Sequence, residues 1–325
     1  MKPDMKVRFA GIELRNPVIA ASGTFAYGIE FEDIVSLDRI GGFVTKGLSR
    51  EPMAGNQAPR IIETAAGMVN AIGLQNIGVK AFLETKLPAL ARYPSCGVIA
   101  NVFGYEVEDY VAVIEALNEA RRGIVAYELN ASCPNTKHGG QVFGTDWRLL
   151  GELVVRAKEV AKRPLIVKLS PNVTSIAAMA RCAEDSGADA ISLINTFVSL
   201  SIDIQTRRPR IANITGGLSG PAIKPIAVRM VWEAAKAVKI PVIGIGGITT
   251  PEDAVEFLLA GATAVQVGTA SYADPRAVER IAQGLEHWCT RHHIERAASL
   301  TGAIDTAPVE KEPEPLADLS AKIKS

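Results

Sequence analysis

Eight short apolar runs alternate with longer amphipathic segments from one end of the chain to the other. Nearly unbroken apolar runs are typical of parallel strands that are buried on both faces. Eight strands that alternate with helices predict an α/β fold of the (β/α)8 TIM-barrel type. A doubly wound open sheet is the alternative, but no GxGxxG sequence follows the first run. The runs are residues 18–21, 42–45, 98–102, 124–129, 165–169, 190–194, 242–245 and 264–267.

The segments between the runs set the expected helices and loops. Helices are predicted over residues 79–92, 107–120, 147–161, 176–186, 223–238, 251–260 and 275–292, with a weaker candidate over 30–37. Residues 7–14 predict a short N-terminal β-hairpin that could plug the bottom of the barrel. Two long βα loops, residues 49–78 and 195–220, predict lids or partner surfaces at the C-terminal face of the barrel. Composition divides the chain into a barrel, residues 1–303, and a polar C-terminal tail, residues 304–325.

Bulk composition excludes several classes of protein. The 35 basic and 35 acidic residues cancel, which favours neither nucleic acid nor an anionic membrane as a partner. Cys96, Cys133, Cys182 and Cys289 form no CxxC pair, so a zinc site or disulfide framework is not expected. Reduced thiols, together with the lack of a signal segment or a membrane-spanning run, predict a cytoplasmic protein. We expect no metal site in this chain.

Glycines follow the last two predicted strands. Gly246 and Gly247 follow the seventh run, and Thr250, three residues after Gly247, is a good helix N-cap. Gly268 and Thr269 follow the eighth run. The loops after strands seven and eight form the usual phosphate site of TIM barrels, where backbone amides bind the anion. The pattern predicts a phosphorylated ligand, and sugar phosphates, pyridoxal phosphate and FMN all fit it.

Two lysines and several asparagines stand at strand ends. Lys46 directly follows the second run, at the end of the predicted strand, and Lys168 lies within the fifth run. A lysine in a buried strand needs a partner, and it could stabilise a reduced flavin or form a Schiff base. Amides both donate and accept hydrogen bonds, so they suit a ring with alternating N–H and C=O groups, such as a pyrimidine. The asparagines are Asn70, Asn101, Asn130 and Asn195.

Cys133 differs from the other cysteines because polar residues surround it just after a strand. Pro134 biases Cys133 towards an extended backbone. The thiol could act as a nucleophile or as a general base, since its thiolate forms once the environment favours it. His138 lies five residues further on, and we interpret it as a loop residue rather than as a catalytic partner.

Four segments together resemble dihydroorotate dehydrogenase, specifically the catalytic subunit of the NAD-linked class 1B type. They are residues 45–52 (TKGLSREP), 67–76 (GMVNAIGLQN), 130–139 (NASCPNTKHG) and 245–248 (IGGI). The resemblance covers roughly residues 5–300 and excludes the tail. It implies an FMN-dependent barrel that oxidises dihydroorotate to orotate in pyrimidine synthesis. Class 2 enzymes use serine as the base and carry an N-terminal membrane segment, whereas this chain has Cys133 and no such segment.

The resemblance also implies a role for each matching residue. Cys133 would take a proton from C5 of the substrate, and hydride would leave C6 for the flavin. Residues implied to bind the substrate are Lys46, Asn70, Ala71, Ile72, Gly73, Leu74, Asn130, Asn195 and Thr196. Residues implied to bind FMN are Ser22, Lys46, Gly47, Asn101, Asn130, Lys168, Ile194, Gly220, Gly246, Gly247, Gly268 and Thr269.

A partner subunit follows from the resemblance and from what the sequence lacks. The class 1B type pairs with a subunit that carries FAD and a 2Fe–2S cluster and hands electrons to NAD. This chain has neither a cysteine cluster nor a dinucleotide fingerprint. We therefore expect a homodimer core within a heterotetramer. A fumarate-using class 1A enzyme, a dihydropyrimidine dehydrogenase-like flavoenzyme and a Schiff-base sugar-phosphate lyase are the alternatives.

Overall fold

The computed structural model describes residues 2–131 and 143–307, and eight of their strands close into a parallel barrel. The strands follow one another round the barrel in chain order, and the last pairs with the first. The (β/α)8 prediction is therefore confirmed. The barrel strands are β3 (Val18–Ala20), β4 (Gly42–Val44), β7 (Gly97–Val102), β8 (Ala126–Asn130), β9 (Leu165–Lys168), β10 (Ala190–Leu193), β15 (Val242–Ile245) and β16 (Ala264–Val267).

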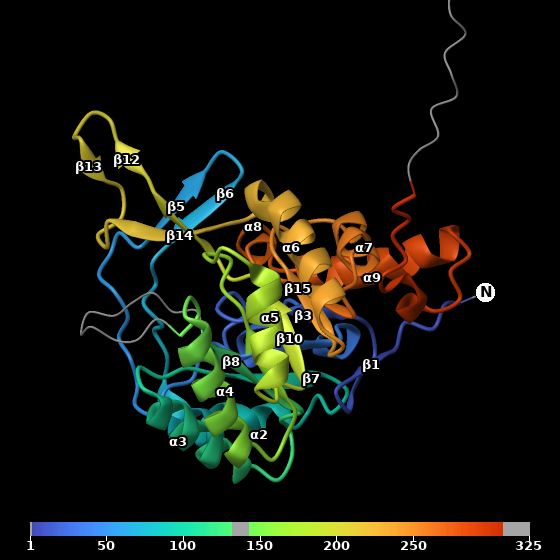
Figure 1. Cartoon of the computed structure of the whole chain (residues 1–325), viewed down its shortest axis with the longest axis horizontal. Coiled ribbons are helices and arrows are strands. Elements are labelled where there is room, and N and C mark those ends of the chain that lie inside the picture. The colour runs from blue at the N-terminus through green and yellow to red at the C-terminus, as the bar shows by residue number, and fades with distance from the viewer. Residues whose placement is uncertain (1, 132–142, 308–325) are drawn as a thin grey trace, which may run out of the picture.

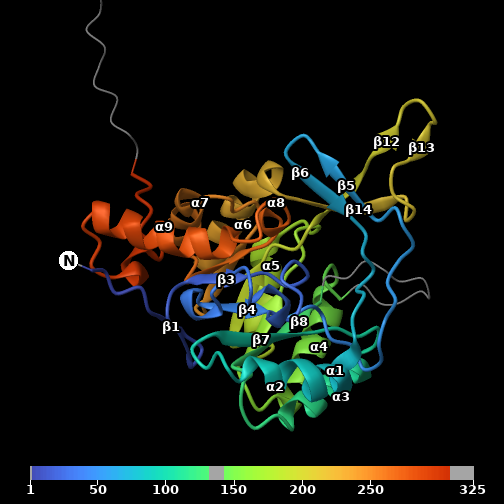
Figure 2. The ribbon, with the colours of Figure 1, turned by 180° about the vertical axis from the view of Figure 1, so that it is seen from behind.

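Helices surround the barrel on the outside, as the views from both sides show (Figures 1 and 2). Each predicted helix from residue 107 onwards is present, with ends that shift by a few residues. A further short helix, α8 (Ala270–Ala273), follows the eighth barrel strand. The longer helices are α3 (Val107–Asn118), α4 (Trp147–Val160), α5 (Ile176–Asp185), α6 (Lys224–Ala237), α7 (Pro251–Leu259) and α9 (Ala277–Arg291). No helix in the described part of the chain is long and apolar enough to cross a membrane.

The prediction of a helix over residues 30–37 is wrong. Two single 3-10 turns, Ile29–Phe31 and Leu37–Arg39, take its place. A segment this short cannot offset the cost of helix nucleation by itself, so tertiary contacts decide its path. Phe31 stacks on Phe25 with ring centroids 4.2 Å apart, which holds the loop against the barrel.

The helix predicted over residues 79–92 is present but interrupted. It consists of α1 (Gly78–Ala81), a π-helical turn (Phe82–Lys86) and α2 (Leu87–Leu90). Pro88 has no backbone N–H and cannot complete the regular ladder of hydrogen bonds from residue i to residue i−4. The backbone therefore widens in the turn that precedes it.

The N-terminal hairpin closes one end of the barrel. β1 (Val7–Phe9) pairs with β2 (Ile12–Leu14), and alternate side chains of both strands are buried. These side chains form one apolar cluster with the inner residues of the barrel strands, among them Ile99 and Ile166. The predicted plug is confirmed.

The two long connections combine into one small antiparallel sheet, which we call the cap. The cap consists of β5 (Ile61–Thr64), β6 (Gly67–Asn70), β11 (Phe197–Leu200) and β14 (Thr215–Ser219), in the order β11-β14-β6-β5. A two-strand extension, β12 (Ile202–Asp203) and β13 (Arg208–Pro209), projects beyond it (Figure 1). The sequence placed both connections at one face, but it did not predict that they pair.

Candidate active site

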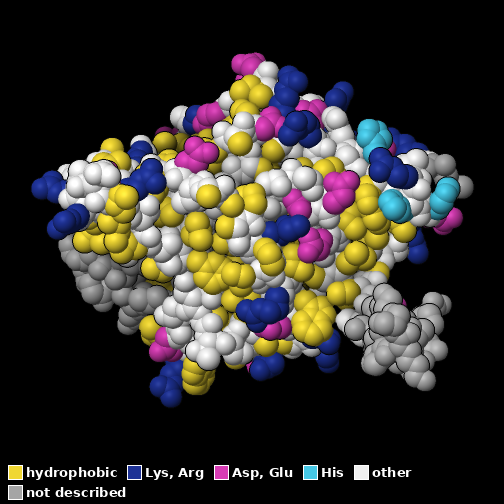
Figure 3. Space-filling view, turned by 90° about the horizontal axis from the view of Figure 1, so that it is seen from above, with side chains coloured by type: hydrophobic (Ala, Val, Ile, Leu, Met, Phe, Trp, Pro, Cys, Tyr) yellow, Lys and Arg dark blue, Asp and Glu magenta, His cyan; other side chains and the backbone are white. Residues whose placement is uncertain are grey.

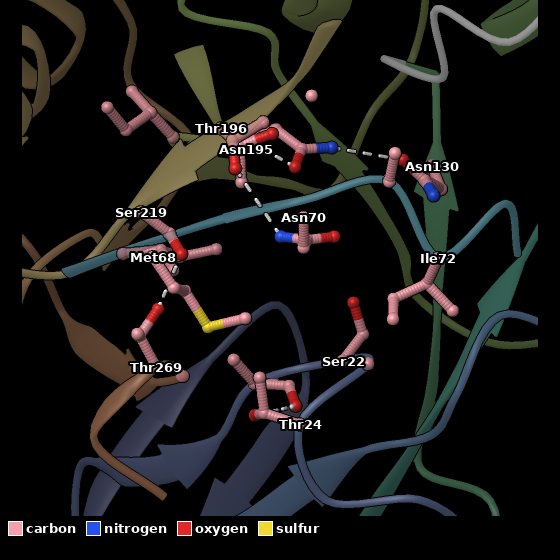
Figure 4. Close-up of a pocket in the computed structure, with 18 of the residues that line it drawn as sticks. Ser22, Thr24, Met68, Asn70, Ile72, Asn130, Asn195, Thr196, Ser219 and Thr269 are labelled. Carbon is pink, nitrogen blue, oxygen red and sulfur yellow. Dashed lines mark hydrogen bonds between the residues drawn. The ribbon is translucent and has the colours of Figure 1, made fainter. Parts of the chain in front are cut away.

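A cavity of about 380 Å³ lies where the cap meets the C-terminal ends of the barrel strands. This volume falls within the range of roughly 300–1,000 Å³ that is usual for small-molecule sites. Figure 4 shows side chains from the cap, among them Asn70 and Ser219, and side chains from the barrel ends, among them Asn130, around the cavity. In a TIM barrel this face carries the chemistry, because the βα loops meet there.

The cavity brings together nearly all the residues that the resemblance singled out. Ser22, Lys46, Gly47, Asn70, Ala71, Ile72, Gly73, Leu74, Asn101, Asn130, Lys168, Ile194, Asn195, Thr196, Gly246, Gly247, Gly268 and Thr269 line it. Gly220 does not line it but lies behind Gly247. Cys133 lies outside the described residues. The individual roles of all these residues stay predictions.

The barrel interior changes from apolar to polar on approaching the cavity. Inner side chains of the lower layer, such as Ile99 and Ala126, belong to the apolar cluster beneath the cavity. Alternate residues of a strand face the same side, so the next inward positions are two residues further along. On β7, β8 and β9 those positions are Asn101, Glu128 and Lys168.

Glu128 organises this polar layer and is fully buried. Its Oε1 accepts a hydrogen bond from Asn101 Nδ2 at 2.8 Å. Its Oε2 accepts from Ser192 Oγ at 2.9 Å and from Gln266 Nε2 at 2.6 Å. Sequence analysis missed Glu128, although a single carboxylate within the apolar run 124–129 was the available signal.

The two lysines reach the cavity in different surroundings. Lys168 is almost fully buried, and its Nζ donates to Ser22 Oγ at 3.3 Å. Burial lowers the pKa of the Lys46 ammonium, and the positive charge of Arg60 lowers it further. A bound anion would oppose both effects on Lys46.

Amide groups link the barrel rim to the cap. Asn195 Nδ2 donates to Asn130 Oδ1 at 3.3 Å, and Asn195 Oδ1 accepts from the backbone N–H of Thr196 at 2.9 Å (Figure 4). Asn70 Nδ2 donates to the Gly217 carbonyl at 3.5 Å. These groups present neutral donors and acceptors, which suit a polar ring better than a simple anion.

At the glycine-rich end of the cavity, the backbone adopts a conformation that other residues rarely adopt. Gly246 and Gly247 have φ angles of 134° and 74°, where residues other than glycine are strained. The helix that follows begins at the predicted N-cap, and Thr250 Oγ1 accepts a hydrogen bond from Asp253 N at 3.1 Å as part of a capping box. Thr269 Oγ1 donates to Ser219 Oγ at 2.8 Å and so joins the barrel rim to the cap (Figure 4).

Several cavity residues were not predicted, and most belong to the cap or its supports. Asn172 supports β11, because its Nδ2 donates to the Thr196 carbonyl and its Oδ1 accepts from Val198 N, both at 3.0 Å. The glycine-rich segment before Gly220 was a signal that went unused. The unpredicted lining residues include Thr24, Met68, Asn172, Thr215, Gly216, Gly217, Ser219 and Tyr272.

Comparison with known proteins identifies the family. The model of the dihydroorotate dehydrogenase family matches residues 4–289. The chain belongs to the dihydroorotate dehydrogenase family. It is therefore an oxidoreductase, and the resemblance noted from its motifs is confirmed.

The relatives differ in the electron acceptor that their names carry. A Solibacter usitatus protein, provisionally named dihydroorotate dehydrogenase A (fumarate), is 60% identical over 94% of this chain and 99% of its own length. Proteins of Pelobacter propionicus and Geobacter sulfurreducens, each named dihydroorotate dehydrogenase B (NAD(+)), catalytic subunit, are 55% identical over 94% of this chain. The matches cover 100% and 99% of those two relatives.

Proposed function

We propose that this chain oxidises dihydroorotate to orotate in de novo pyrimidine synthesis, with FMN as its cofactor, in the cytoplasm. The observation that carries the proposal is a single cavity that gathers neutral amides, two lysines and a glycine cradle in a member of this family. A Schiff-base lyase would use the lysines, but its chemistry would not account for the neutral amides that line the cavity.

The described residues fit FMN. Asn101 and the cap amides supply donors and acceptors for a ring that carries N–H and C=O groups. The Asn101 Oδ1 atom is buried and has no hydrogen-bond partner in the described part of the chain. Gly246, Gly247, Gly268 and Thr269 would hold the phosphate, because backbone amides at such a turn favour an anion.

The protein's own groups would then divide the reaction between them. Cys133 would act as the base that takes the proton from C5, while Asn130 and Asn195 orient the pyrimidine ring. Lys46 would be held protonated by the anionic substrate, which reverses the effect of burial on its pKa. When bound, FMN supplies the acceptor for the hydride that leaves C6.

For the electron acceptor we propose NAD, reached through a partner subunit that carries FAD and a 2Fe–2S cluster. The names of the class B relatives support this, since they call those proteins catalytic subunits. Exposed aliphatic side chains on and beside the cap, including Val198, Leu200, Ile202 and Ile204, support association with another chain. Figure 3 shows apolar side chains spread over much of the face seen from above. A homodimer core within a heterotetramer is the assembly we propose.

Fumarate is the second candidate acceptor, because the 60% identical relative carries that name. Fumarate would then reoxidise the flavin of the isolated chain after its reduction by dihydroorotate. Under the NAD-linked proposal fumarate has no effect, and NAD reduction appears only when the partner subunit is added. Turnover with fumarate by the isolated chain would replace the first proposal with the second.

The absorption spectrum of the purified chain tests the reaction itself. We expect the long-wavelength bands of bound flavin, and we expect dihydroorotate to bleach them in the absence of oxygen. This half-reaction needs no partner subunit. A folded chain that stays colourless after incubation with FMN would exclude the proposed function.

A further inference from the structure

Asp253 joins the two backbone segments that meet at the glycine-rich end of the cavity. Its Oδ2 accepts from the N–H and the Oγ1 of Thr249, at 2.8 and 2.9 Å, and from the N–H of Thr250 at 2.9 Å. Its Oδ1 accepts from Nζ of Lys224, the first residue of α6, at 2.7 Å. One side chain therefore bonds both to the turn after Gly247 and to the start of the neighbouring helix.

The two segments touch directly where Gly247 lies. A Cβ on Gly247 would come within 2.7 Å of the Gly220 carbonyl oxygen and 2.8 Å of Lys224 Cβ. A Cβ on Gly246 would come within 2.7 Å of Ala227 Cβ in α6. Because no side chain separates the segments, a small shift of either would change the spacing of the backbone amides at this end of the cavity.

Lys224 is the cation of this junction, but carboxylates engage it. Besides Asp253, its Nζ contacts Glu256 Oε2 at 2.7 Å. The hydrogen bond to Asp253 is the main cause that raises the pKa of Lys224, and the hydrogen bond to Glu256 raises it further. Lys224 is not among the residues that line the cavity. An anion held here would therefore contact backbone amides and hydroxyls rather than this ammonium group.

We propose that Asp253 is a positioning residue for the phosphate group of the ligand. It fixes the Gly246–Gly247 turn against the start of α6, so that the amides converge on the phosphate. The inference rests on the proposed FMN site. Asp253 touches no ligand itself, because it acts only through the turn and through Lys224.

The test compares FMN with riboflavin, which carries the same ring without the phosphate. Dissociation constants are measured by flavin fluorescence on flavin-free whole chain. Asp253→Ala is expected to weaken FMN binding about tenfold, the effect of losing roughly 1.4 kcal/mol. Riboflavin binding is expected to change less than about twofold, since the ring contacts lie elsewhere. The preference for FMN over riboflavin should therefore shrink.

Glu256→Ala is the matched control. It removes the other carboxylate from Lys224 but no bond to the glycine turn, so the FMN preference should stay as in the unaltered chain. Asp253→Asn keeps an acceptor for the turn and should lose less FMN affinity than Asp253→Ala. The asparagine variant also keeps the inference testable if the alanine variant does not fold.

An equal loss of FMN and riboflavin affinity, or an unchanged FMN preference in both Asp253 variants, would overturn the inference. If the unaltered chain binds neither flavin, the proposed function itself fails, so the two failures are distinguishable.

Discussion

At the scale of single residues, the site combines neutral amide groups with a lysine held in an unfavourable environment. Lys46 is partly buried next to the charge of Arg60, and both lower its pKa. The folded chain therefore holds this proton less tightly than the unfolded chain. Between the two pKa values the unfolded state binds more protons, so stability rises with pH there, and it stays at its lower level below the folded pKa.

Replacement of Lys46 should separate stability from function. Lys46→Met removes a poorly solvated charge, so the ligand-free chain should unfold about 2 °C higher and lose the rise in stability at alkaline pH. Orotate binding should fall sharply. Calorimetry at several pH values and an orotate titration measure the two effects.

Lys80→Met serves as the control, since Lys80 is exposed, and neither quantity should move. A Lys46→Met chain that is less stable than the original at every pH would contradict the account of the buried charge.

Cys133 carries the sharpest chemical prediction. Cys133→Ala should keep the flavin colour and lose most of the bleaching by dihydroorotate. Cys133→Ser should retain little, because a hydroxyl is a far weaker base than a thiol near neutral pH. Stopped-flow absorbance measures the rates, and near-normal bleaching by Cys133→Ala would show that another group takes the proton.

At the scale of elements, the end of β8 is fixed from outside the barrel. Tyr110 on α3 is buried, and its hydroxyl donates to the carbonyl of Asn130 at 2.9 Å. The bond secures the strand end that presents Asn130 and leads towards Cys133. The interrupted helix over residues 78–90 differs, since Pro88 interrupts it locally and none of its residues line the cavity.

Tyr110→Phe should lower the free energy of unfolding by about 1–2 kcal/mol, because the buried carbonyl loses its partner. It should also weaken orotate binding severalfold through the looser position of Asn130. Denaturant unfolding and an orotate titration measure the two effects.

Tyr127→Phe is the matched control. Its hydroxyl also makes hydrogen bonds, to Asn118 and Arg163, and Tyr127 does not line the cavity. We expect a similar loss of stability with unchanged orotate affinity. Equal losses of affinity in both variants would argue against a specific role for the Tyr110 bond.

At the scale of the whole molecule, the two ends of the barrel have separate tasks. The hairpin end is apolar and closed, and the cap end is polar and carries the cavity. Apolar burial at the closed end stabilises the fold and so offsets the cost of burying charged groups such as Glu128 and Lys168 at the polar end. The division between barrel and tail at residue 303 stays a prediction.

Leu14→Ala should show this separation. Leu14 is buried in the hairpin plug, and its truncation should cost about 2–5 kcal/mol of unfolding free energy. FMN affinity, measured well below the unfolding temperature, should stay within about twofold. Leu14→Ile conserves volume and should cost less than about 1.5 kcal/mol. A large loss of FMN affinity in Leu14→Ala would show that the two ends are coupled.

The sequence by itself determined the barrel and the plug, and its resemblance to a known family implied most of the residues around the cavity. Burial on both faces leaves a local apolar pattern, and strand ends of a barrel meet at one face whatever the loops do. Only the tertiary structure decided that residues 67–70 pair with residues 215–219 in the cap, and that Glu128 accepts hydrogen bonds from two amides and a hydroxyl on three other strands. These contacts join positions far apart in the chain. The local sequence pattern does not predict them, because hydrogen bonds between distant segments depend on where the whole fold places those segments.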